Sequence, residues 1–185
     1  MRGLSLLALR TQVLQATNPT EKQVCHELVE KVYTKKGYTF SKNFQPADVF
    51  YVAVEGIITA TISIVPDSLS DGLPLDKIYK EEARELRNRY GTIGEVIEFA
   101  VDDDNPKASG LRTLVLPLFR EILYCARTKK INVLGITVNP IDTRFYSLLG
   151  FQGDCTVEKT HPGVGAPAVF LSVVVKQWLA DRQVT

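Results

Sequence analysis

The stretch from Gly94 to Arg112, GEVIEFAVDDDNPKASGLR, constrains the fold of this 185-residue chain more than any other. It begins with a nearly continuous apolar run up to Val101, which is typical of a strand that is covered on both faces. An acidic loop follows, and then the start of a long helix over residues 109–130. The stretch therefore favours a mixed α/β sheet in which this strand is central and helices cover both faces.

Two carboxylates interrupt the apolar strand, at Glu95 and Glu98. Because successive side chains of a regular strand alternate, residues three apart are expected on opposite faces of the sheet. Apolar surroundings raise the pKa of a carboxyl group, so that it can accept a proton near neutral pH. Glu95 and Glu98 are therefore candidate acid–base groups.

The loop after this strand has a pattern that suits a bound anion. Lys107 and Gly110 precede the long helix, whose free N–H groups and partial positive charge would favour a phosphate. Gly110 would let the backbone approach such a ligand closely. An ordinary connection between a strand and a helix explains the same residues equally well, so both interpretations stay open.

The rest of the chain alternates between strand and helix patterns. Asn18 is a suitable cap for a first helix that ends at Gly37, and Asp76 is expected to cap a later, charged helix. Glu55-Gly56 is typical of a tight hairpin turn. The expected strands are 4–16, 49–54, 57–65, 94–101, 131–138, one near 157, and 168–175, and the later helices are 77–89, 109–130 and 142–149.

Three aromatic residues, Tyr38, Phe40 and Phe44, follow the first helix. They would suit the wall of an apolar channel. They would equally suit the closure of one edge of the core, and the sequence does not decide between these two interpretations.

Composition narrows the class of protein. The length and a hydrophobic content of 45% indicate one globular domain over residues 1–185. A net charge of +1 with scattered basic residues gives no footprint for a nucleic acid partner. Three widely spaced cysteines and two distant histidines do not suggest a metal site, and reduced thiols favour a cytoplasmic location. The N-terminal segment MRGLSLLALR is too short for a membrane-spanning helix, so no integral membrane segment is expected.

The order of elements and three motifs resemble the GNAT acyltransferase superfamily, whose fold is a mixed, mostly antiparallel central sheet with helices on both faces. The motifs are GEVIEFAV, KASGLR and NPIDTRFYSLLGF. Within the superfamily, the segment PDSLSDGLPLDKIYKEEARELRNRYGTIGEVIEFAVD is similar to the N-acyl amino acid synthase branch, which is related to the acyl-homoserine-lactone synthases. The resemblance extends over nearly the whole chain.

The resemblance implies an N-acyltransferase that moves a medium- or long-chain fatty acyl group from acyl carrier protein to the amine of an amino acid or a similar small amine. No cofactor is held permanently, and an acyl-phosphopantetheine thioester is the co-substrate. Glu95 matches the position of a general base, although a structural carboxylate that orders the neighbouring loop would also explain it. Glu98 is the rival base. Tyr146 matches a residue that protonates the leaving thiolate, although an aromatic residue that packs under the pantetheine arm would also explain it.

The resemblance also implies where the acyl donor binds. The residues expected to contact the donor are Phe99, Ala100, Val101, Lys107, Gly110, Leu111, Arg112, Asn139 and Phe145. Arg112 departs from the family pattern, which has a small residue there, and its bulk would crowd the pyrophosphate of free coenzyme A. This departure favours a carrier protein, which brings one phosphate. The alternatives are an acetyl-CoA-dependent acetyltransferase for small amines and a non-catalytic acyl-binding module.

Overall fold

The computed structural model describes residues 12–39, 48–67, 72–105, 111–153 and 156–181. Their strands form one seven-stranded sheet in the order β1-β2-β3-β4-β5-β7-β6. Neighbouring strands are antiparallel except β4 and β5, which are parallel. The strands are β1 Val13–Gln15, β2 Asp48–Val54, β3 Ile57–Pro66, β4 Ile93–Val101, β5 Val133–Val138, β6 Lys159–His161 and β7 Ala166–Val174.

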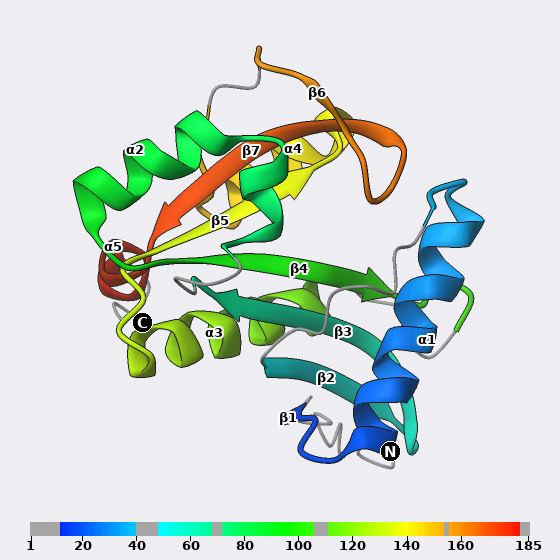
Figure 1. Ribbon diagram of the computed structural model, residues 1–185. Coiled ribbons are helices and arrows are strands. Elements are labelled where there is room, and N and C mark those ends of the chain that lie inside the picture. Colours follow the sequence, from blue (N-terminus) through cyan, green and yellow to red (C-terminus); the bar gives the residue numbers. More distant parts are fainter. Residues whose placement is uncertain (1–11, 40–47, 68–71, 106–110, 154–155, 182–185) are drawn as a thin grey trace, which may run out of the picture.

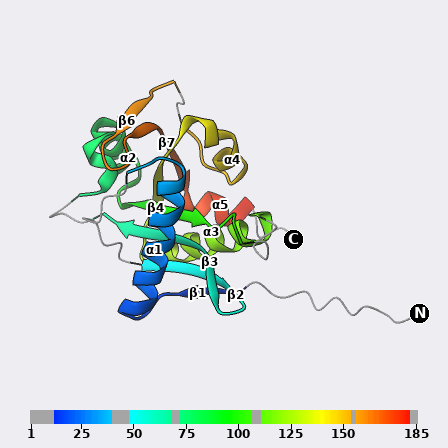
Figure 2. The same ribbon diagram turned by 90° about the vertical axis from the view of Figure 1, so that its right-hand side faces the viewer.

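Helices cover both faces of this sheet, as the sequence predicted (Figure 1). Helices α1 and α2 lie on one face, and α3 and α5 lie on the other, with α4 beside the end of β5 (Figures 1 and 2). The helices are α1 Pro19–Lys35, α2 Lys80–Tyr90, α3 Leu111–Thr128, α4 Thr143–Leu148 and α5 Val175–Asp181, with short 3-10 helices η1 Pro74–Lys77 and η3 Pro140–Asp142. The mixed, mostly antiparallel α/β sheet is therefore confirmed.

The largest core cluster lies between the sheet and α3. Leu118, Phe119, Ile122 and Leu123 of α3 are fully buried against β3, β4 and β5. This wide apolar face explains why α3 forms a long helix although Pro117 lies inside it. On the opposite face, smaller clusters lie under α1 and under α2 with η1.

Several local predictions are confirmed. The Asn18 side chain accepts a hydrogen bond from the backbone N–H of Glu21 at 2.9 Å, and Gly37, with φ 76°, ends α1. Glu55 and Gly56 form the turn between β2 and β3 with φ values of 52° and 80°, which matches the twist of a tight hairpin.

The prediction for Asp76 is wrong. Its carboxylate accepts a hydrogen bond from the backbone N–H of Leu73 at 2.7 Å and pairs with Arg87. Asp76 therefore stabilises the N-terminal end of η1 and does not cap α2. Helix α2 begins later, at Lys80. Helix α5 was not predicted, and of the expected strand 4–16, residues 4–11 lie outside the described residues.

Candidate active site

The parallel strands β4 and β5 separate halfway along their length. They pair from Ile93 with Val133 to Val96 with Ile136, and beyond that point β4 pairs only with β3 and β5 only with β7. The two strands diverge toward their carboxyl ends (Figure 1). A cavity of about 740 Å³ opens there, and its walls come from α1, η1, β4, β5, α4 and the β6–β7 hairpin. Ligands commonly bind at such an opening in a sheet.

A bulge in β4 lies at the floor of this cavity. Ile97 pairs with Ser63 and Ala100 pairs with Thr61, so Glu98 and Phe99 together face the single residue between them on β3. Glu98 has φ 53°, a left-handed conformation that is uncommon for a residue with a side chain. The extra residue shifts the alternation of side chains after Ile97 by one position.

The bulge places both glutamates on the same face of the sheet. Glu95 accepts a hydrogen bond from the backbone N–H of Leu75 in η1, and Glu98 approaches His26 of α1, with its Oε1 3.6 Å from Nδ1. Both η1 and α1 lie on this face. The prediction that Glu95 and Glu98 point to opposite faces is therefore wrong, because it assumed a regular strand.

Glu95 is the most deeply buried charged group of the described residues that line the cavity. It is 1% exposed, and its Oε2 lies 2.8 Å from the N of Leu75. Burial raises the pKa of Glu95 to about 8, with a smaller contribution from the nearby Asp76, while the hydrogen bond from Leu75 acts in the opposite direction. Such a carboxyl group can take up and release a proton in the neutral to alkaline range.

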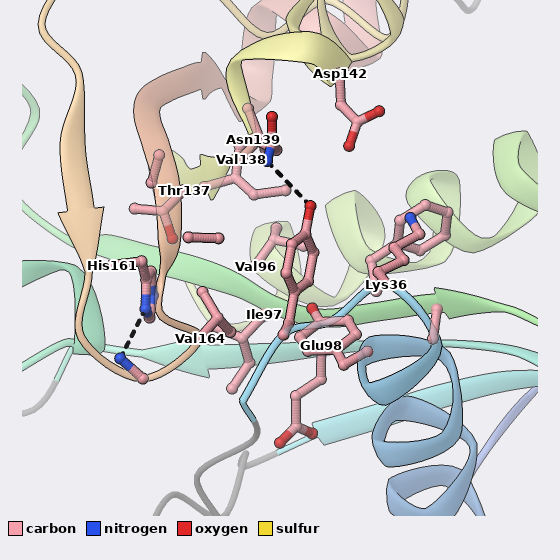
Figure 3. Close-up of a pocket in the computed structure, with 18 of the residues that line it drawn as sticks. Lys36, Val96, Ile97, Glu98, Thr137, Val138, Asn139, Asp142, His161 and Val164 are labelled. Carbon is pink, nitrogen blue, oxygen red and sulfur yellow. Dashed lines mark hydrogen bonds between the residues drawn. The ribbon is translucent and has the colours of Figure 1, made fainter.

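Glu98 has a similar character with more access to the cavity. Burial raises the pKa of Glu98 to about 7, and the hydroxyl of Ser63, 3.4 Å from Oε2, partly offsets that shift. Its side chain lies at the cavity beside α1 (Figure 3). The cavity therefore contains two carboxyl groups that titrate near neutral pH.

An aromatic wall lines the α4 side. The ring of Phe99 lies 6.3 Å from that of Phe145 and nearly parallel to it, and Tyr146 packs edge-on against both Phe99 and Phe119. Burial raises the pKa of the Tyr146 hydroxyl, so this group stays protonated at all working pH values. The wall therefore offers an apolar surface with a phenolic donor.

Two contacts connect the end of α1 with the opposite walls of the cavity. Asn139 Nδ2 donates to the hydroxyl of Tyr38 at 3.0 Å (Figure 3), and the backbone N–H of Thr39 donates to the carbonyl of Val164 at 3.1 Å. Asn139 Oδ1 accepts from the backbone N–H of Ile141 at the start of η3, which fixes the amide group. The cavity is thus bridged at the end of α1.

An ion-pair cluster holds η1 in place beside Glu95. The guanidinium of Arg87 donates to both oxygens of Asp67, at 2.6 and 2.9 Å, and to both oxygens of Asp76, at 2.6 Å each. These hydrogen bonds hold the pKa of Asp76 below its usual value. Because Asp76 and Leu75 are adjacent in η1, the cluster fixes the N–H group that binds Glu95.

Most of the residues predicted for the site line this one cavity. They are Glu95, Glu98, Phe99, Ala100, Val101, Asn139, Phe145 and Tyr146, with Tyr38 of the predicted aromatic channel. Leu111 and Arg112 are in the first turn of α3, but their side chains are not among those described, and Lys107, Gly110, Phe40 and Phe44 lie outside the described residues. The roles assigned to these residues stay predictions.

The sequence analysis missed the η1 and β6–β7 walls of the cavity. Lys77, Ile78, His161 and Ala168 contribute to them, as does Lys36 at the end of α1. The only signal for His161 was its place in an HPGVG turn between two strands. Periodicity does not show which turn folds back over a distant strand, so the sequence did not predict that His161 lines the cavity.

The described residues contain no cluster of three or more His, Cys, Asp or Glu side chains that could hold a metal ion. Within the same residues, no helix is long and apolar enough to cross a membrane. The arrangement can bind an apolar chain along the aromatic wall and can move a proton through a buried carboxylate.

The family model of the N-acyl amino acid synthase FeeM matches residues 24–174. The solved structure of FeeM, an N-acyl amino acid synthase from uncultured soil microbes, is 30% identical to the chain, with 92% of this chain and 94% of that chain covered and a TM-score of 0.80. None of the curated proteins that were compared matches the chain.

More distant structures share the fold. The acyl-homoserine-lactone synthase LasI is 12% identical over 89% of this chain and 91% of its own, with a TM-score of 0.63. An acyl-CoA N-acyltransferase from Pseudomonas aeruginosa is 10% identical over 89% of this chain and 99% of its own, with a TM-score of 0.61. The GNAT-like fold that the motifs predicted is therefore confirmed.

Proposed function

Because the chain belongs to the FeeM family of N-acyl amino acid synthases, we propose that it transfers a medium- or long-chain fatty acyl group from acyl carrier protein to the amino group of an amino acid. The observation that supports this proposal most is the cavity between β4 and β5, where an aromatic wall and the buried Glu95 share one space. Its volume of about 740 Å³ is typical of pockets for small ligands, at about 300–1,000 Å³.

In the proposed reaction, the acyl-pantetheine arm lies along Phe99–Val101, and Asn139 and Tyr146 flank the thioester. Glu95 accepts a proton from the ammonium group of the acceptor, and the free amine attacks the thioester carbonyl carbon. The C–S bond then breaks and an amide forms, and the second proton that the nitrogen loses passes to the departing thiolate, which leaves as a thiol. Both substrates are held in one cavity, so positioning contributes together with proton transfer.

The choice of acyl carrier protein as donor is supported by the sequence around the start of α3. Arg112 stands where the superfamily has a small residue, and a bulky side chain there would hinder backbone contacts to a pyrophosphate. Carrier-bound pantetheine has one phosphate, with which Lys107 or Arg112 would pair. The same two side chains would attract the acidic surface of a carrier protein.

The proposal is tested by mass spectrometry of organic extracts from bacterial cells that express the chain, with cells that contain an empty vector as the control. N-acyl amino acids that occur only with the protein would identify the acceptor and the chain length. Purified protein is then given acyl carrier protein and acyl-CoA donors in parallel. Transfer from acetyl-CoA to small amines, with none from long-chain donors, would contradict the proposal.

Tyr146→Phe is expected to lower kcat by about 10- to 100-fold, which corresponds to the loss of one hydrogen bond to a developing charge. The hydroxyl is a poor source of a free proton because burial raises the pKa of Tyr146, so its proposed role is to donate a hydrogen bond to the leaving thiolate. Single-turnover rates measure the effect. Unchanged rates would show that the ring only packs under the donor arm.

A further inference from the structure

His161 points into the cavity from the β6–β7 hairpin, on the side opposite Lys36 and Asp142 (Figure 3). Backbone hydrogen bonds and strand pairing hold its main chain in the hairpin. The carbonyl of His161 accepts hydrogen bonds from the N–H groups of Val164 and Gly165, at 3.2 and 2.8 Å, and the residue pairs with Ala166 across the hairpin. The hairpin therefore fixes the point from which the side chain enters the cavity.

The hydrogen bonds of the imidazole define which of its nitrogens carries the proton. The backbone N–H of Gly163 donates to Nδ1 of His161 at 3.1 Å, so Nδ1 bears a lone pair (Figure 3). Burial lowers the pKa of His161, so the ring is neutral at neutral pH. The remaining proton is then on Nε2, which is a donor and cannot accept a proton from an amine. His161 is therefore suited to bind an acceptor oxygen, not to act as a base.

The charges around the cavity are unevenly distributed. Among the described residues that line it, the α1–α4 side has Lys36 together with three carboxylates, Glu98, Asp103 and Asp142. The side formed by η1 and the β6–β7 hairpin has Lys77 and His161.

Glu95 lies on the floor between these two sides, and its pKa of about 8 keeps most of it uncharged at pH 7. Among the described residues that line the cavity on the η1–β6 side, Lys77 is the one with a full positive charge. An anionic group is therefore favoured on this side.

Hydrogen bonds connect this side of the cavity to Glu95 through η1. Lys159, two residues before His161 on the same face of β6, donates from Nζ to the carbonyl of Ile78 at 3.0 Å, which joins β6 to the end of η1. At the other end of η1, the N–H of Leu75 binds Glu95. Lys77 lies between these two anchored residues.

We propose that His161 and Lys77 form the subsite for the α-carboxylate of the acceptor amino acid. The Nε2–H of His161 donates a hydrogen bond to one carboxylate oxygen, and the ammonium of Lys77 supplies the opposite charge. The α-amine, one carbon away, is thereby directed toward Glu95 and the thioester. This inference rests on the proposed function, and it names the two side chains that would select an acceptor with a free carboxylate.

The test compares two acceptors, the amino acid identified in the extracts and the amine that lacks its carboxylate. His161→Leu is expected to raise KM for the amino acid by about 10- to 100-fold with little change in kcat, because a hydrogen bond to a charged group is lost. Lys77→Gln is expected to raise the same KM. KM for the decarboxylated amine should be the same in wild type and both variants.

Two further variants separate this role from a structural one. His161→Gln keeps a neutral N–H donor at a similar reach and is expected to recover most of the affinity. Gly163→Ala keeps the imidazole, but a Cβ at Gly163 would lie 3.1 Å from Cε1 of His161 and shift the ring by a few tenths of an ångström, so KM for the amino acid should rise slightly. An equal rise in KM for both acceptors, or a fall in kcat alone, would overturn the proposal.

Binding without a donor distinguishes failure of the subsite from failure of the proposed function. Each common amino acid is added to the protein without acyl donor, and the shift in Tm is measured. A shift in wild type that is absent from His161→Leu would support the subsite even where no fatty acyl transfer is detected. No shift in wild type with any amino acid up to millimolar concentrations would overturn it.

Discussion

Glu95→Gln is expected to lower the rate of acyl transfer by about 10²- to 10⁴-fold, the usual contribution of a general base, without unfolding the protein. The variant keeps an oxygen that can accept the hydrogen bond from Leu75 N–H, which lies 2.8 Å from Oε2 in the wild type. It removes the group that would accept the proton of the acceptor amine. Single-turnover rates with saturating donor measure this effect directly.

The pH dependence gives an independent check on the same residue. The pKa of Glu95 is raised to about 8, so the basic form increases as pH rises through that value. The wild-type rate should therefore be half-maximal near pH 8 and level off about one pH unit above it, and the Gln variant should lack this dependence. Glu98→Gln is the matched control, because the pKa of Glu98 is about 7. If Glu98→Gln alone abolishes the rate and its pH dependence, Glu98 is the base.

As pH rises, the stability of the wild-type protein should fall while its activity rises. The unfolded chain releases the Glu95 proton near pH 4.5, as an exposed glutamate does, whereas the folded protein keeps it up to about pH 8. Between these values the folded state binds more protons than the unfolded state, so wild-type stability falls as pH rises. The Gln variant lacks this loss and should be more stable than wild type at about pH 9, but not at about pH 4. Urea unfolding at both pH values would show it, and a pH-independent difference would contradict it.

Arg87→Ala is expected to reduce the free energy of unfolding by about 2–3 kcal/mol, less than the roughly 3–5 kcal/mol typical of a fully buried pair. The guanidinium makes hydrogen bonds to both oxygens of Asp67 and of Asp76, and the three side chains are 19–29% exposed. Without Arg87, two partly buried carboxylates would face each other. Denaturant unfolding at pH 7 measures the loss.

Arg84→Ala is the control on the same helix. Arg84 pairs with Glu81 one turn away, and both side chains are more than 60% exposed, so its removal should change stability by at most about 0.5 kcal/mol. Arg87 holds the pKa of Asp76 below its usual value, so the difference between wild type and Arg87→Ala should shrink as pH falls below the ordinary pKa of an aspartate and Asp76 becomes protonated. Equal effects of the two arginines would contradict this explanation.

The Arg87 variant should also affect catalysis, because the ion-pair cluster fixes η1 and η1 binds Glu95 through Leu75. Arg87→Lys keeps the charge but cannot bind two carboxylates with a planar fork. Its stability is expected to lie between wild type and Arg87→Ala. The two partners of Arg87 are 11 and 20 positions away in the chain, so a local sequence pattern does not identify them.

Local chemistry determined much of this protein. The hairpin turn at Glu55-Gly56, the cap at Asn18 and the end of α1 at Gly37 depend on residues within a few positions of each other, so the sequence predicted them correctly. Motifs such as NPIDTRFYSLLGF resemble those of the family, and the family predicted the fold. These motifs extend over elements that form the cavity.

The tertiary structure decided how the site residues face one another. Periodicity placed Glu95 and Glu98 on opposite faces, but the pairing of β4 with β3 forces a bulge at Glu98 and brings both to one face. Asp76 was predicted as the cap of the following helix, but it lies in η1, where its carboxylate accepts from Leu73 and pairs with Arg87. The place of His161 in the cavity depends on where the β6–β7 hairpin folds. These outcomes arise from contacts between segments far apart in the chain, whose free energies a local pattern does not contain.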